Sequence, residues 1–131
     1  MADIIEILKS IPDYIGSNGR REEEIAKAEN VLGVSFAEDY RTYLKEIGLA
    51  CYDGHELTGL AKSDRLDVVS VTKQQRERVG EAASSWYVVE ETGIDGIVIW
   101  QAPTGEVFQT DSVAAYHELC SSLSEFILGS F

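Results

Sequence analysis

The chain has 131 residues, of which 44% are hydrophobic and 26% are charged, so its length and composition indicate one globular domain. Its 11 Lys and Arg residues stand against 23 Asp and Glu residues, which gives a formal net charge of −12. This balance argues against binding to nucleic acid or to anionic membrane surfaces, because both interactions need clustered basic side chains.

The first residues and the cysteines indicate a cytoplasmic protein. Asp3 and Glu6 stand where a signal peptide has basic residues followed by an apolar run. No stretch approaches the roughly 18 apolar residues of a membrane-spanning helix. The two cysteines are too few for a disulfide scaffold, so both thiols are expected to be reduced.

The first two predicted helices lie within residues 3–33. Residues 3–11 carry isoleucine and leucine at helical spacing, and Pro12 follows them. After a loop at residues 16–19, three glutamates open a second helix over residues 22–32. Gly33 is expected to end that helix, because glycine readily adopts the left-handed conformation of a helix C-terminus.

A third helix is predicted from a capping sequence. Ser35 and Glu38 have the spacing of a capping box, which places the helix over residues 35–47. Tyr40 and Tyr43 lie on its apolar stripe and are expected in the core.

The middle of the chain predicts strands joined by short turns. Residues 56–60 and 66–71 are predicted as strands, whereas the polar residues 72–79 predict an exposed helix. Three further strands, which short turns would arrange as an antiparallel meander, are predicted at residues 86–89, 96–100 and 107–110.

The last predicted element is a helix. Ser122 and Glu125 form a second capping box. The apolar residues of this helix are Leu123, Phe126, Ile127 and Phe131. Helices, then strands, then a helix indicate the α+β class. We therefore expect a single domain over residues 1–131, in which an antiparallel sheet of about four to six strands packs with N-terminal helices and this closing helix.

The acidic residues are concentrated in the last part of the chain. Arg78 is the last basic residue, so residues 79–131 carry −8 and residues 1–78, with 15 acids and 11 bases, carry −4. The eight acids of the second segment are Glu81, Glu90, Glu91, Asp95, Glu106, Asp111, Glu118 and Glu125. Cations that neutralise them must come from the N-terminal part of the fold or from a partner.

Four Cys and His residues have spacings that a zinc site permits. They are Cys51, His55, His117 and Cys120. The same residues also allow a disulfide between the two cysteines, or simple packing and solvation. The spacing of Cys51 with His55 and the spacing of His117 with Cys120 are not specific to metal sites. We therefore favour packing as a small hydrophobic residue for Cys51 and exposure in a turn for His55. We therefore expect no metal and no cofactor.

The motifs of common catalytic sites do not occur in the sequence. It has no G-x-S-x-G nucleophile motif, no G-x-G-x-x-G and no P-loop. A carboxylate pair for acid–base catalysis could be drawn from the 23 acids, but so large a set has no diagnostic value. We expect a protein that is not an enzyme.

Several segments resemble one protein family. An acid-containing helix with a Leu-Gly stop, residues 25–33, precedes an aromatic-rich helix at residues 36–44. A first strand, a central sheet and a closing helix follow at residues 56–60, 86–110 and 122–127. Between about residues 22 and 128, this order resembles the SUKH superfamily, which includes many bacterial immunity proteins of contact-dependent and related toxin systems.

The resemblance implies a protein that binds the C-terminal domain of a cognate toxin in the cytoplasm and blocks its active site. It carries over no catalytic residue. The acidic balance would match a basic partner such as a nuclease. A regulatory or scaffold domain that binds a cellular protein is the alternative, and a small-molecule site would need a deep pocket. The protein is expected to be a monomer or a weak homodimer formed through an edge strand.

Two acidic zones are candidates for partner contact. Asp53 and Glu56 lie in or beside the turn at residues 52–55. The second zone flanks a turn between two predicted strands and contains Glu90, Glu91 and Asp95. Tyr52 is added because an exposed aromatic ring among carboxylates is a typical interface hot spot. The other aromatic residues that could face either a partner or the core are Tyr14, Trp86, Tyr87 and Trp100.

Overall fold

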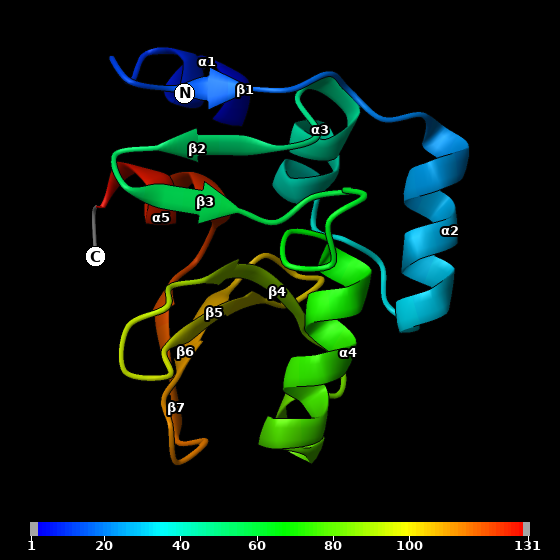
Figure 1. The fold of residues 1–131 in the computed structure, drawn as a ribbon, viewed down its shortest axis with the longest axis vertical. Helices are drawn as coiled ribbons and strands as arrows, with labels where there is room; N and C mark the ends of the chain where they lie inside the picture. The colour runs from blue at the N-terminus through cyan, green and yellow to red at the C-terminus, as the bar shows by residue number, and fades with distance from the viewer. Residues whose placement is uncertain (1–2, 130–131) are drawn as a thin grey trace.

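The computed structural model describes residues 3–129 (Figure 1). The helices are α1 (Ile4–Lys9), α2 (Glu22–Leu32), α3 (Glu38–Glu46), α4 (Val68–Val79), the short 3₁₀ helix η1 (Glu81–Ala83) and α5 (Leu123–Leu128). The strands are β1 (Ile15–Gly16), β2 (Ala50–Tyr52), β3 (His55–Leu57), β4 (Tyr87–Glu91), β5 (Val98–Gln101), β6 (Val107–Thr110) and β7 (Tyr116–Cys120). Within the described range, none of the helices has the length and apolar character that crossing a membrane requires.

The strands form two antiparallel sheets that meet at Thr58. One sheet has the order β1-β2-β3 and the other the order β4-β5-β6-β7. The backbone N–H of Thr58, directly after β3, donates to the carbonyl of Val89 in β4 at 2.9 Å. The Thr58 hydroxyl donates to the carbonyl of Val88 at 2.7 Å. The predicted α+β class is therefore confirmed, with its strands divided between two sheets.

Helices cover both faces of the four-stranded sheet. On one face the larger core contains Tyr40 and Tyr43 of α3, which are buried as predicted, together with residues of α1, α2 and α5. On the other face Trp86 and Trp100 are buried with Val71 beneath α4, which runs beside β4 and β5 in Figure 1. Neither tryptophan is therefore available to a partner.

Two predicted helices are confirmed with their end signals. The bounds of α2 are those predicted, and Gly33 follows it at a φ of 69°. The Ser122 side chain caps α5 by accepting a hydrogen bond from the N–H of Glu125 at 3.1 Å. Phe131, which was assigned to the apolar side of this helix, lies outside the described residues.

The strand predicted at residues 66–71 is wrong. The Asp67 carboxylate instead caps α4 by accepting a hydrogen bond from the N–H of Ser70 at 3.2 Å. Val68 and Val71 are buried on the first turns of this helix. The β-branched side chains suggested a strand, but the capping aspartate and the packing surface favour a helix.

The capping box predicted at Ser35 is also wrong. α3 begins later, with Ala37 as its N-cap and no hydrogen bond from the Ala37 side chain. The N–H of Phe36 donates to Glu29 Oε2 at 2.7 Å, and the N–H of Ala37 donates to the Tyr87 hydroxyl at 2.8 Å. Side chains from α2 and β4 therefore bind the two backbone N–H groups directly before α3, and the helix begins without a capping side chain.

The sequence pattern did not predict β1, β2 or β7. The first two span only two and three residues, which is too short for an alternating pattern. β7 is exposed along its first three residues and therefore lacks an apolar alternation. It is an end strand of the four-stranded sheet.

Candidate functional site

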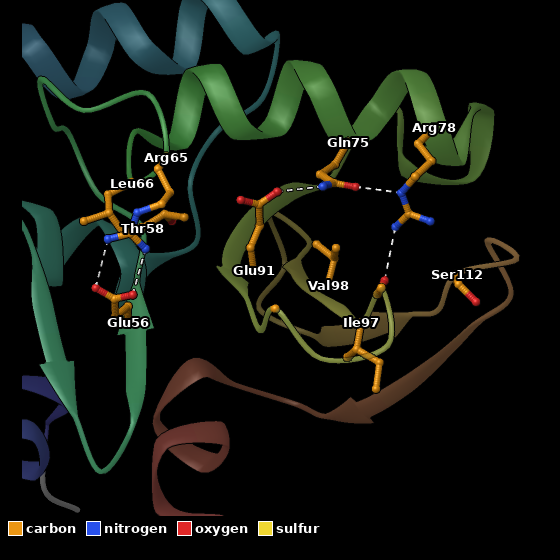
Figure 2. A pocket seen from close by; sticks show the side chains of 12 residues that line it. Glu56, Thr58, Arg65, Leu66, Gln75, Arg78, Glu91, Ile97, Val98 and Ser112 are labelled. Atoms are coloured by element: carbon orange, nitrogen blue, oxygen red, sulfur yellow. Dashed lines mark hydrogen bonds and ion pairs between the residues drawn. The ribbon is translucent and has the colours of Figure 1, made fainter.

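A cavity of about 470 Å³ lies between α4, the end of β3 and the turn that joins β4 to β5 (Figure 2). Apolar side chains of Leu66, Ile97 and Val98 line part of its wall. The charged and amide side chains around it come from β3, the segment before α4, α4 itself and β4, and they are Glu56, Arg65, Gln75, Arg78 and Glu91.

Arg65 and Glu56 form an ion pair on one side of this cavity. Nη1 of Arg65 lies 2.8 Å from Oε1 of Glu56, and Nη2 lies 3.2 Å from Oε2. The hydrogen bond from Arg65 lowers the pKa of Glu56 below its ordinary value. Both side chains are more than half exposed, so the pair contributes little to stability and can exchange partners.

A chain of hydrogen bonds forms the other side of the cavity. Nε2 of Gln75 donates to Oε2 of Glu91 at 2.6 Å, and Nε of Arg78 donates to Oε1 of Gln75 at 2.8 Å. Arg78 also donates to the carbonyl oxygens of Asp111 at 3.0 Å and Gly96 at 3.4 Å. This one arginine therefore ties α4 to the β4–β5 turn and to the β6–β7 turn.

The structure brings together parts of both predicted acidic zones. Glu56 and Glu91 line the same cavity, although they belong to different sheets. Asp95 is exposed in the β4–β5 turn, whose glycines, Gly93 and Gly96, line the cavity. Asp53 is also exposed but is not among the lining residues, and its N–H donates to the Asp13 carboxylate at 2.9 Å. Four of the nominated acids therefore reach the surface.

Glu90 and Tyr52 lie inside the molecule, with exposed fractions of 4% each. The Glu90 carboxylate accepts from Nδ1 of His55 at 3.0 Å, and the Tyr52 ring stacks on the His55 ring with 5.0 Å between centroids. Strand β4 has a register shift between Val88 and Glu90, which disturbs the regular alternation of faces. Neither Glu90 nor Tyr52 presents an exposed group to a partner.

The Cys and His residues do not converge on a metal site. Within residues 3–129, no group of three or more His, Cys, Asp and Glu side chains is placed to hold a metal ion. Both cysteines are free thiols, and burial raises the pKa of the Cys120 thiol to about 11. Among the described residues that line the cavity there is neither histidine nor cysteine. The site offers hydrogen-bonding and ion-pairing groups rather than a nucleophile with its base.

Three residues of the site, Arg65, Gln75 and Arg78, were not among those predicted from the sequence to contact a partner. Gln75 and Arg78 belong to the helix expected to be solvent-exposed. Their spacing of three residues places them on one helix face, and this spacing was the available signal. Arg65 lies in the irregular segment before α4, where no sequence pattern indicates a direction for its side chain.

A larger recess of about 830 Å³ lies elsewhere on the molecule. Residues of α1, α3, α5 and the β5–β6 turn line it, among them Ile4, Thr42, Pro103 and Leu128. None of the residues predicted from the sequence to contact a partner lies there. The smaller cavity is therefore the candidate site.

Among residues 3–129, four Lys and Arg side chains form ion pairs, all with acids of the N-terminal part of the chain. Arg21, Arg41, Lys45 and Arg65 form their ion pairs with glutamates at positions 22, 24, 29 and 56. Within residues 3–129, no Lys or Arg side chain forms an ion pair with Glu91, Asp95, Asp111 or Glu118. These four carboxylates therefore remain available to external cations.

One family model matches the chain. It is described as SMI1-KNR4 cell-wall (SUKH_5), and the match extends over residues 1–131. The search of curated proteins finds no match. The family match spans the fold and the site together.

Proposed function

The chain belongs to the SMI1-KNR4 family of the SUKH superfamily, and from this membership we propose that it is an immunity protein that neutralises a cognate bacterial toxin domain. Members of the superfamily are generally immunity or binding domains without enzymatic activity. The proposed action is direct: the protein binds the toxin in the cytoplasm and covers its active site or substrate channel.

The observation that carries this proposal is a set of four acids, in the second half of the chain, that have no Lys or Arg ion-pair partner among the described residues. Residues 79–131 contribute −8 to the net charge and contain no Lys or Arg. Glu91, Asp95, Asp111 and Glu118 have no Lys or Arg ion-pair partner among residues 3–129. Such a surface matches a toxin with a basic groove, such as a nuclease, and accelerates its capture.

The cavity supplies the proposed contact site for the toxin. Glu56 and Glu91 face the same recess, and Asp95 lies in the turn beside it. An inserted Lys or Arg side chain could pair with Glu91, whose carboxylate accepts a hydrogen bond from the neutral amide of Gln75. It could also replace Arg65 on Glu56, because that ion pair is exposed. Once the bound toxin covers the cavity, these contacts would be desolvated, and such contacts rather than rim charges should determine the affinity.

Co-expression tests the proposal. The gene of this protein is expressed together with the C-terminal domain of a large toxin encoded beside it, and both survival and co-purification are scored. Survival that depends on this protein, with a complex that co-purifies, supports an immunity function. Death of the cells at equal expression levels, with no complex, contradicts it.

A further inference from the structure

β7 is an open edge of the four-stranded sheet. It pairs with β6 on one side, and no described strand pairs with it on the other. In Figure 1 β7 forms the outer border of the sheet. An unpaired edge presents backbone N–H and C=O groups that another strand can bind.

The hydrogen-bond pattern indicates which residues of β7 face outward. The N–H of Asp111 donates to the carbonyl of Ala115 at 3.1 Å, which closes the hairpin. Tyr116 is opposite Thr110, and Glu118 is opposite Phe108. Bonded and non-bonded pairs alternate along an antiparallel ladder. The backbone groups of Tyr116 and Glu118 are therefore directed away from β6.

The side chains of the same two residues form a platform beside the edge. The Tyr116 ring packs edge-on against Trp86, with 5.3 Å between centroids, and remains 54% exposed. Trp86 in turn stacks on Phe108 at 4.2 Å. Glu118 is exposed on the face it shares with Phe108, and among residues 3–129 it has no ion pair or side-chain hydrogen bond. An added strand would meet an aromatic surface followed by a free carboxylate.

Charge decides which kind of strand fits this edge. A second copy of the chain would bring another net charge of −12 and place acidic β7 strands side by side. Like charges opposite each other on adjacent strands are destabilising, whereas a Lys or Arg opposite Glu118 is favourable. A cation or an apolar side chain is also favourable over the exposed Tyr116 ring.

We propose that β7 binds an extended basic segment of a protein partner, which adds to the four-stranded sheet as a fifth strand. The segment alternates basic and apolar residues, so that two basic side chains, two residues apart, lie on the face of Tyr116 and Glu118. One of them covers the Tyr116 ring and the other pairs with Glu118. Main-chain hydrogen bonds supply the affinity and these two side chains supply the selectivity. The proposal deepens the toxin-binding function and rests on it for the identity of the partner.

A peptide titration tests the edge without any toxin. The full chain, labelled with ¹⁵N, is titrated with a six-residue peptide of alternating Lys and Val, capped at both ends, up to about 1 mM, because an isolated short strand binds weakly. Amide shift changes centred on Tyr116, His117 and Glu118 are expected. A peptide with Glu in place of Lys is expected to cause none. Changes centred on the cavity instead, equal changes with the Glu peptide, or none with either peptide would overturn the proposal.

Two substitutions at Glu118, with a control at Glu23, distinguish binding at the β7 edge from an effect of the overall net charge. Glu118→Lys should abolish the peptide-induced shifts, whereas Glu23→Lys, an equal change of charge on exposed α2, should leave them within about twofold. Glu118→Pro removes an outward N–H that β6 does not use, so it should also abolish binding while the thermal unfolding transition is retained. Binding that survives both substitutions at Glu118 would overturn the proposal.

Failure of this inference can be distinguished from failure of the immunity function. If Glu118→Lys still protects cells and co-purifies with the toxin domain, the toxin binds elsewhere and only the proposed edge is wrong. If the wild-type chain gives no protection while the peptide binds β7, the edge recognises a basic strand and the toxin assignment is wrong.

Discussion

Nδ1 of His55 lies 3.0 Å from both carboxylate oxygens of Glu90, which joins β3 to β4 through a buried acid. The Glu90 side chain is only 5% exposed, whereas that of His55 is 43% exposed. Burial raises the pKa of Glu90 above its ordinary value, and the hydrogen bond from His55 partly opposes this effect. The contact between His55 and Glu90, which links the two sheets, therefore depends on the protonation of Glu90.

Glu90→Gln should change the pH dependence of stability. A raised pKa means that folded Glu90 binds its proton more tightly than the unfolded chain does. The stability it contributes is therefore present below the unfolded pKa and lost as the pH rises through the folded pKa. Because glutamine does not ionise, the free energy of unfolding of the variant should rise relative to that of wild type as the pH increases between about pH 4 and about pH 8.

Urea unfolding at several pH values measures this shift. Glu23→Gln serves as the matched control, because Glu23 is exposed at the surface of α2. A difference between Glu90→Gln and wild type that stays constant across this pH range would contradict the assignment.

The sequence could not predict the His55–Glu90 pair, because its members are 35 residues apart and no local pattern links them. Sequence signals predicted a helix end correctly where the residue that determines it lies next to the helix, as Gly33 does after α2 and Ser122 does before α5. They failed where the start of a helix depends on side chains that are distant in the sequence. The N–H of Ala37, at the start of α3, donates to the hydroxyl of Tyr87. The candidate site follows the same rule. Glu56 and Glu91 were predicted to face a partner from their places beside two turns, but their convergence on one cavity depends on how the two sheets meet.

Two buried tyrosine hydroxyls should respond differently to removal. The Tyr87 hydroxyl accepts from the N–H of Ala37 at 2.8 Å and donates to Oε1 of Gln101 at 2.7 Å. The buried Tyr52 hydroxyl has no hydrogen-bond partner among residues 3–129. Tyr87→Phe leaves two buried polar groups unsatisfied and should cost about 2 kcal/mol of unfolding free energy. Tyr52→Phe should be neutral or stabilising.

Thermal or urea unfolding of the two variants checks this pair, and each serves as the control for the other. The change in both cases is the loss of one oxygen atom from a buried ring. Equal destabilisation by both substitutions would show that the Tyr52 hydroxyl also has a partner.

Arg78→Ala should loosen the turns beside the cavity. The guanidinium donates to Gln75, to the carbonyl of Asp111 and to that of Gly96. Its loss should lower the free energy of unfolding by about 1 kcal/mol and speed amide hydrogen exchange in the β4–β5 and β6–β7 turns. Lys73→Ala, an exposed change on the same helix, is the matched control. Exchange rates in both turns that equal those of this control would contradict a role for Arg78 in ordering them.

Glu91→Lys combined with Asp95→Lys should slow association with a basic toxin domain. Both residues lie at the β4–β5 hairpin beside the cavity, and neither has a Lys or Arg ion-pair partner among residues 3–129. Glu90 is left unchanged, because it is buried and its replacement by lysine would test folding rather than binding. The association rate constant should fall about tenfold at low salt.

Stopped-flow binding at two ionic strengths measures the effect. The double variant Glu23→Lys with Glu81→Lys has the same net charge but changes two exposed acids away from the hairpin, so it controls for overall charge. The difference between the two double variants should shrink between about 0.05 M and about 0.5 M salt, because screening shortens the reach of surface charges. If both double variants slow association equally, only the total charge matters, and the β4–β5 hairpin has no special part in capturing the toxin.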